Sequence, residues 1–120
     1  MRMNEIDFEA QPPIDGYGPG GFRIDGTWYT GGLLILPSGV DTVAEPLDTA
    51  TIAPFLRDRD QIDLVLIGMG ADIASVPNPV RTALEEAELG IEVMSTPSAC
   101  RTYNVLLTED RRVGAILLPV

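Results

Sequence analysis

Strands and helices alternate along the second half of the chain, and this alternation restricts the fold more than any other feature of the sequence. Three apolar segments have strand length, "IDLVLIG" (62–68), "IEVMS" (91–95) and "VGAILLP" (113–119). Two segments with apolar residues at helical spacing follow the first two of them, at 78–89 and 96–109. Alternating strands and helices predict a mainly parallel sheet covered by helices, and therefore an α/β domain.

A third, short helix is expected earlier in the chain, at Asp48–Arg57, where Pro54 limits its regularity or shifts its start to about Thr51. Each of the two later helices begins with a capping residue that is followed by proline, Asn78 in one and Thr96 in the other. Gly90 is expected to end the helix at 78–89 as its C′ residue. The apolar face of the helix at 96–109 is expected to hold Ala99, Cys100, Tyr103, Leu106 and Leu107.

An antiparallel hairpin is expected ahead of these units. Asp25-Gly26 stands between two β-rich runs, and this dipeptide favours a type I′ turn because both residues tolerate positive φ. In that register Arg23 faces Trp28 on the outer face of the hairpin, at cation–π distance. The second strand is expected to continue into the apolar run 33–36, which is typical of a strand buried on both faces.

One further strand is expected at Asn4–Phe8, where apolar and acidic residues alternate. The last strand follows its helix after the short link 110–112, so it is expected to return antiparallel, at an edge of the sheet or against the hairpin. The predicted fold is thus a three-layer α/β domain with a mixed, mainly parallel central sheet, an N-terminal antiparallel hairpin and about three helices. With 120 residues, one domain spans residues 1–120.

Charge and missing residue types exclude several functions. The chain has 18 acidic residues against eight arginines, no lysine and no histidine, and its net charge is −10. Binding to nucleic acid is not expected, because phosphate backbones attract clusters of Lys and Arg. Without His or Lys there is no Ser-His-Asp triad, His-bound zinc, Schiff base or P-loop lysine. We therefore expect no catalytic residue, no metal and no cofactor.

The apolar runs also argue against direct insertion into a membrane, since none approaches the roughly 20 residues that a spanning helix needs. The start of the chain, "MRMNEIDFEA", has no apolar signal region, which predicts a cytoplasmic protein. Its single cysteine, Cys100, cannot form an intrachain disulfide.

The stretch Gly16–Gly21 reads G-Y-G-P-G-G and matches the dinucleotide-binding pattern G-x-G-x-x-G. That pattern binds a pyrophosphate only where it follows a strand and opens a helix. Here Gly21 leads directly into the predicted strand Phe22–Ile24. We therefore interpret these glycines as a turn.

The best candidate for ligand binding joins the carboxyl end of one predicted strand to the start of the helix at 96. Open α/β sheets bind ligands at such strand ends, and a helix start offers free N–H groups to an anion or carboxylate. The candidate residues are Gly68, Gly70, Thr96, Ser98, Arg101 and Asn104. A glycine-eased strand exit and plain helix capping by Thr96 explain the same residues without a ligand.

Cys100 lies beside Arg101 near this helix start, and both features lower the pKa of a thiol. Its place on the apolar face has the opposite effect, and the chain has no His or Lys to act as a base. A structural role is the favoured interpretation.

Several segments together resemble the small Mth-type domain family, which includes the mitochondrial complex I assembly factor 3 and the adipogenesis-associated Mth-domain protein. The resemblance covers nearly the whole chain and rests on "IDGYGPGGFRIDG", "LVLIGMG" and, above all, "TPSACRTYNVLLTEDRRVGAILLP". It implies a compact three-layer α/β fold, no established catalysis for bacterial members, and an assembly or interaction role for the eukaryotic ones. The residues that match the recurrent motif are Gly68, Gly70, Thr96, Arg101, Thr102, Tyr103, Asn104 and Arg112.

The missing catalytic chemistry and this resemblance together favour a non-catalytic interaction module, one that supports assembly of a membrane complex, respiratory or other, from the cytosolic side. Trp28 and Arg23 are its expected contact residues, since Trp and Arg are common interface anchors. The alternative is a small anionic-ligand-binding protein, or an enzyme, with its pocket between Gly68–Gly70 and Thr96. A homodimer formed through the hairpin face is a third hypothesis.

Overall fold

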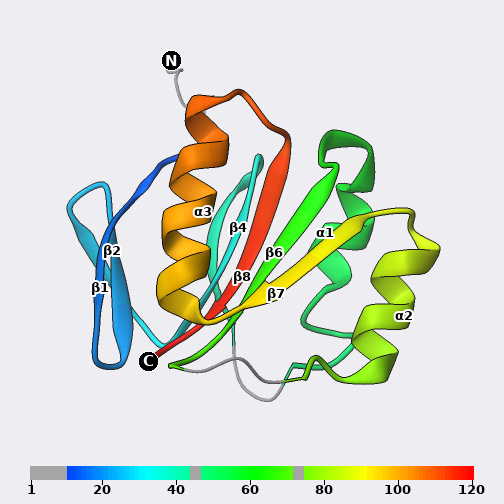
Figure 1. Cartoon of the computed structure of the whole chain (residues 1–120), viewed down its shortest axis with the longest axis horizontal. Coiled ribbons are helices and arrows are strands. Elements are labelled where there is room, and N and C mark those ends of the chain that lie inside the picture. Colours follow the sequence, from blue (N-terminus) through cyan, green and yellow to red (C-terminus); the bar gives the residue numbers. More distant parts are fainter. Residues whose placement is uncertain (1–10, 44–46, 72–74) are drawn as a thin grey trace.

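The computed structural model describes residues 11–43, 47–71 and 75–120, and it contains two sheets and three α-helices (Figure 1). The strand predicted at Asn4–Phe8 lies outside the described residues. One sheet has three strands, ordered β1 (Ile14–Gly18), β2 (Gly21–Ile24) and β3 (Thr27–Thr30). The other has five, ordered β5 (Gly39–Val43), β4 (Gly32–Leu36), β8 (Val113–Leu118), β6 (Leu64–Met69) and β7 (Gly90–Met94). The helices are α1 (Ala53–Arg57), the short 3₁₀ helix η2 (Arg59–Gln61), α2 (Asn78–Glu86) and α3 (Thr96–Thr108).

The five-stranded sheet is the middle of three layers, which confirms the predicted fold class. Side chains alternate across β4, so Leu33 and Ile35 pack on one side and Leu34 and Leu36 on the other. The first side is covered by α3 and the three-stranded sheet, and the second by α1 and α2 (Figure 1). The buried run at 33–36 therefore has the two covered faces that the sequence predicts.

The predicted hairpin is confirmed in its turn and its register. Asp25 and Gly26 have φ of 51° and 80°, as a type I′ turn requires. Arg23 pairs with Trp28 across β2 and β3, and both side chains are exposed.

The hairpin's second strand does not continue into the run at 33–36, and that prediction was wrong. β3 ends at Thr30, and Gly31, with φ of 91°, redirects the chain into the five-stranded sheet. Two strands were also not predicted, β1 and β5. β1 is rich in glycine, and β5 is exposed at most positions, so neither has a strong apolar alternation.

The last strand was expected at an edge or against the hairpin, and this too was wrong. β8 lies in the centre of the five-stranded sheet, parallel to β6 and antiparallel to β4. α3 covers the sheet and runs in the direction opposite to β7, the strand before it. The short link after α3 reverses the chain again, so β8 runs parallel to β7. The unit β7–α3–β8 is therefore an ordinary parallel crossover.

The helix ends differ from the predicted ones in detail. Asn78 is the first residue of α2 and Pro77 occupies the cap position, so the prediction that Asn78 caps this helix was wrong. The residue with positive φ after α2 is Glu88, at 64°, whereas Gly90 already begins β7. α1 begins at Ala53, two residues beyond the start that was expected at about Thr51.

Candidate functional site

Thr96 fastens the start of α3 to the ends of two strands. Its side chain is fully buried, and its Oγ1 donates a hydrogen bond to the Leu118 carbonyl (2.7 Å) and accepts one from the Gly70 N–H (2.8 Å). The Thr96 N–H also donates to the Gly70 carbonyl (2.7 Å). The prediction that Thr96 caps the helix was wrong, since Ser95 occupies that position and makes no side-chain capping bond.

Gly68 and Gly70 allow α3 to approach the sheet this closely. A Cβ atom on Gly68 would lie 2.9 Å from both Cα and Oγ1 of Thr96, closer than van der Waals contact allows. Gly70 has φ of 99°, a conformation that other residues rarely adopt. The two glycines thus serve the junction of β6 with α3.

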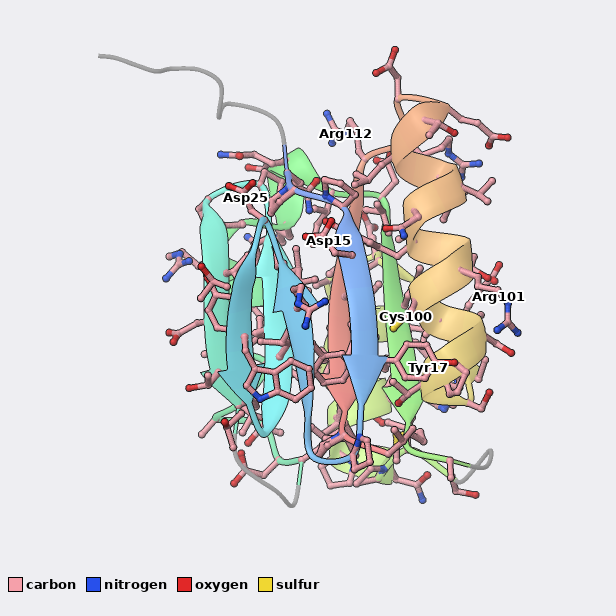
Figure 2. The ribbon with its side chains drawn as sticks, turned by 90° about the vertical axis from the view of Figure 1, so that its left-hand side faces the viewer. Asp15, Tyr17, Asp25, Cys100, Arg101 and Arg112 are labelled. Carbon is pink, nitrogen blue, oxygen red and sulfur yellow. The ribbon has the colours of Figure 1, made fainter. Side chains whose placement is uncertain are left out.

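Ser98 and Arg101 are the accessible part of the predicted ligand site. The Ser98 hydroxyl lies 3.2 Å from the Ser95 hydroxyl, and Arg101 Nη2 donates to it over 3.4 Å. Figure 2 shows Arg101 directed away from the sheet, whereas Cys100 lies between α3 and the sheet. Any anion held here would contact the outer surface of α3.

Cys100 is buried, and burial raises the pKa of its thiol from 9.0 to about 11. The positive charge of Arg101 acts in the opposite direction, with a smaller effect. The thiol is therefore protonated at neutral pH, which lowers its nucleophilicity.

Asn104 belongs to another contact, about two helical turns beyond Thr96. Its Oδ1 accepts the Ile14 N–H (2.8 Å) and its Nδ2 donates to the Ile14 carbonyl (2.9 Å). The Tyr103 hydroxyl donates to the Pro12 carbonyl (2.9 Å), close by in the chain. The two side chains attach the segment that leads into β1 to α3. The structure therefore does not bring Asn104 together with Thr96.

Two further motif residues lie elsewhere. Arg112 Nη2 donates to the Asp60 carbonyl (2.7 Å) and lies 3.4 Å from the Asp63 carboxylate, which joins the start of β8 to the start of β6. Figure 2 shows Arg112 near the top of the view, whereas Cys100 lies near the middle of the molecule. Thr102 is half-buried and makes no side-chain hydrogen bond within the described part of the chain.

The outer face of the three-stranded sheet carries Trp28, which is 46% exposed. Its indole lies over Gly21, where a Cβ atom would come within 2.7 Å of the ring, and it also reaches Gly18. Pro19-Gly20 forms the turn between β1 and β2, and Gly20 has φ of 81°. The interpretation of Gly16–Gly21 as a turn is confirmed for Pro19-Gly20 only, because Gly16 and Gly18 lie in β1 and Gly21 lies in β2. Two glycines of this stretch also make room for the indole.

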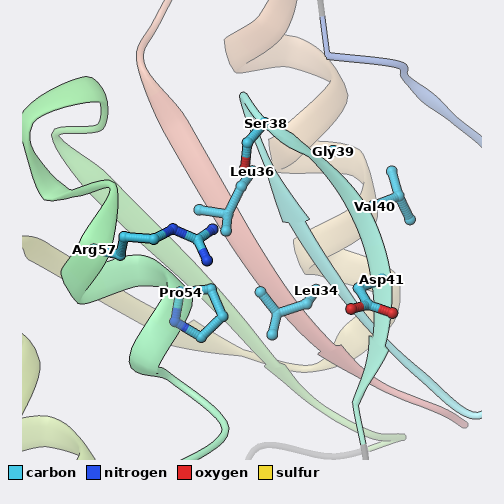
Figure 3. Close-up of a pocket in the computed structure, with 8 residues that line it drawn as sticks. All are labelled: Leu34, Leu36, Ser38, Gly39, Val40, Asp41, Pro54 and Arg57. Atoms are coloured by element: carbon cyan, nitrogen blue, oxygen red, sulfur yellow. The ribbon is translucent and has the colours of Figure 1, made fainter.

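A groove that was not predicted lies between α1 and the β4–β5 hairpin (Figure 3). Its volume is about 200 Å³, and its walls include Leu34, Leu36, Pro54, Arg57 and Asp41. The groove exists because β5 and α1 lie at a certain distance from each other. Neither the strand β5 nor this distance could be predicted from a local sequence pattern.

Within residues 11–43, 47–71 and 75–120, no three His, Cys, Asp or Glu side chains are placed to hold a metal ion. None of the helices in that part of the chain is long and apolar enough to span a bilayer.

Comparison with known proteins places these features in a family. A family model described as "Protein of unknown function (DUF498/DUF598)" matches residues 14–118. An uncharacterised protein of Rhodobacter capsulatus is 48% identical over 120 residues, which cover 100% of this chain and 94% of that protein. The human NADH dehydrogenase (ubiquinone) 1 alpha subcomplex assembly factor 3 is 32% identical over 110 residues, covering 88% of this chain. The matched region spans 60% of that human protein.

Solved structures show the same fold. A protein described as an outer membrane protein from Bartonella henselae superposes with a TM-score of 0.89 at 37% identity, over 93% of this chain and 98% of that one. A Bordetella pertussis protein described as a Mth938-like domain superposes with a TM-score of 0.73 at 20% identity, over 99% and 91% of the two chains. These matches confirm the resemblance to Mth-type domains.

Proposed function

The chain belongs to the DUF498/DUF598 family of proteins of unknown function, and from this premise we propose that it is a non-catalytic interaction module. It binds a partner protein while a multisubunit membrane complex is assembled, and it does so from the cytosol. A relative that is named as a complex I assembly factor supports this proposal. The contacts that the family-motif side chains make in this chain also support it. Thr96, Asn104 and Arg112 direct their polar groups to backbone atoms of this chain. Such contacts stabilise a fold, and they contribute no reacting group.

The observation that carries the proposal is the exposed indole of Trp28. Large aromatic side chains gain most from burial in an interface, and Trp is the residue most enriched among binding hot spots. The strand register places Gly16 and Arg23 beside Trp28 on the same outer face. This face, which we call the Trp28 face, therefore presents one aromatic ring and one guanidinium on a surface without bulky neighbours.

Affinity capture from a detergent extract of the native membranes tests the proposal. The chain is expected to retain subunits of a membrane complex, identified by mass spectrometry. Trp28→Ala should lower that retention at least tenfold, since hot-spot truncations cost about 2 kcal/mol or more.

Tyr17→Ala is the matched control. Tyr17 is also an exposed aromatic residue, at 42%, but it pairs with Phe22 and so lies on the opposite face of the sheet. Its replacement should leave capture unchanged. Equal loss in both variants, or capture of no complex subunit by the unmodified chain, would contradict the proposal.

A further inference from the structure

We propose that the groove between α1 and the β4–β5 hairpin binds a free α-amino acid with an apolar side chain, in its zwitterionic form. Here the groove means the concave surface lined by Leu34, Leu36, Asp41, Pro54 and Arg57. It lies on the α1 side of the five-stranded sheet, whereas the Trp28 face belongs to the layer on the other side. The proposal does not depend on the proposed function.

The floor of the groove is apolar. Leu34 and Leu36 project from β4 toward α1, and the ring of Pro54 lines the opposite wall (Figure 3). The volume of about 200 Å³ is small, which favours a ligand of a few heavy atoms over a drug-sized one. The side chain of a ligand placed there would leave water and contact these apolar groups, which is favourable.

Arg57 supplies a guanidinium group at one side of the groove, and hydrogen bonds to Asp58 fix its position. Its Nε and Nη2 donate to Asp58 Oδ1 (2.9 Å) and Oδ2 (3.3 Å), and Asp58 is itself anchored by the Ser38 hydroxyl (2.8 Å). The hydrogen bond from Arg57 lowers the pKa of Asp58, so both groups are charged at neutral pH. Arg57 Nη1 has no hydrogen-bond partner among the described residues, and the side chain is 65% exposed. It can donate to a ligand carboxylate.

Asp41 supplies the opposite charge on the other side. It pairs with Leu34 across the β4–β5 hairpin, so the two side chains share the face that lines the groove. Figure 3 shows Leu34 between the Asp41 carboxylate and the Arg57 guanidinium. Asp41 Oδ1 accepts the Thr42 N–H (2.8 Å), which fixes the carboxylate. Its Oδ2 has no partner in the described part of the chain and can accept an ammonium group.

The charge balance selects the class of ligand. Asp41 and Asp58 outnumber Arg57 here, and the whole chain carries a net charge of −10. A ligand with only a negative charge is therefore repelled, whereas a zwitterion places its ammonium group at Asp41 and its carboxylate at Arg57. An internal segment of a protein has neither charge, and a chain terminus has only one of them.

Titration of the isotope-labelled chain with L-leucine, followed by NMR, tests the proposal. Saturable shifts are expected in the β4–β5 hairpin and α1. Glycine lacks the side chain, leucinamide lacks the carboxylate and N-acetyl-leucine lacks the ammonium group, so each should bind at least tenfold more weakly. Leucinamide and N-acetyl-leucine each lose one charge-assisted hydrogen bond, and glycine loses the apolar contact with the floor of the groove.

Two variants assign the charges. Asp41→Asn removes the charge but keeps an oxygen for the Thr42 N–H, and Arg57→Gln removes the guanidinium. Each should weaken leucine binding at least about tenfold, while Arg111→Gln, at an exposed residue outside the groove, should not. The proposal is overturned if leucine causes no saturable shift, if leucinamide or N-acetyl-leucine binds as tightly as leucine, or if Asp41→Asn binds leucine normally.

Discussion

Thr96 and Gly70 exchange two hydrogen bonds, from the Thr96 N–H to the Gly70 carbonyl and from the Gly70 N–H to the Thr96 hydroxyl. The same hydroxyl donates to Leu118, so one buried side chain joins α3 to β6 and β8. Three elements thus depend on a single hydroxyl group, and its removal should be measurable.

We expect Thr96→Val to lower the free energy of unfolding by about 2–4 kcal/mol, because the isosteric change leaves a buried N–H and a buried carbonyl with one partner fewer. Thr96→Ser retains the hydroxyl and should cost about 1 kcal/mol, for one methyl group. Urea denaturation measures both. A valine variant as stable as the serine variant would show that the hydroxyl contributes little.

Gly68→Ala should destabilise the fold by about 1–3 kcal/mol, because the new methyl group overlaps the backbone of Thr96. Gly16→Ala is the matched control, since a Cβ atom there meets nothing within 4 Å. Thermal unfolding of the two variants compares the positions directly. Equal unfolding temperatures would mean that α3 can move away from β6 at little cost.

Asn104→Ala should release β1 from α3. The N–H and carbonyl of Ile14 lose their partner, and the local free energy of opening should fall by about 1–3 kcal/mol. Hydrogen exchange at Ile14 and in β1 reports this loss, while exchange in β6 should change less. Asn78→Ala, which removes a side chain without a capping bond, should leave β1 protected.

The pH dependence of stability should reflect Cys100. Its pKa in the folded chain is raised from 9.0 to about 11, so folding favours the neutral thiol. This stabilisation is fully present below pH 9.0 and is lost as the pH rises toward about 11. Urea denaturation across that interval should show a steeper decline for the native chain than for Cys100→Ala. Parallel declines would show that the thiol is not the titrating group.

Arg101→Ala should change the free energy of unfolding by no more than about 0.5 kcal/mol, because the side chain is exposed. The same variant tests the ligand alternative at the start of α3. A carboxylate or phosphate that raises the unfolding temperature of the native chain, but not of Arg101→Ala, would favour an anion site. A ligand effect that survives the substitution would exclude Arg101 from such a site.

Local chemistry explains which parts of the fold could be predicted. The Asp25-Gly26 turn determines a hairpin register by itself, and the apolar faces of α2 and α3 follow from helical spacing. The strands β1 and β5 escaped prediction because neither has a strong apolar alternation, although each pairs with its neighbour in sequence across a short turn. The position of β8 depends on which strands were still unpaired.

The candidate residues could be selected from the sequence, but their roles could not. The sequence predicts that Thr96 caps a helix, whereas in the structure its hydroxyl donates to the carbonyl of Leu118. The sequence makes Asn104 a candidate for an anion site, whereas in the structure its side chain accepts the N–H of Ile14. In each case the partner lies at least 20 residues away, at separations of 22 and 90 positions, where local patterns carry no information.

The central position of β8 also bears on how the chain folds during its synthesis. β4 and β5 can pair early, and β6 and β7 can pair once residue 94 has left the ribosome. Neither pair contacts the other through backbone ladders until Val113–Leu118 inserts between them. Any half-sheet that forms before that segment emerges leaves the backbone edge of β4 or β6 unpaired, and the five-stranded sheet is complete only once residues 113–118 are available.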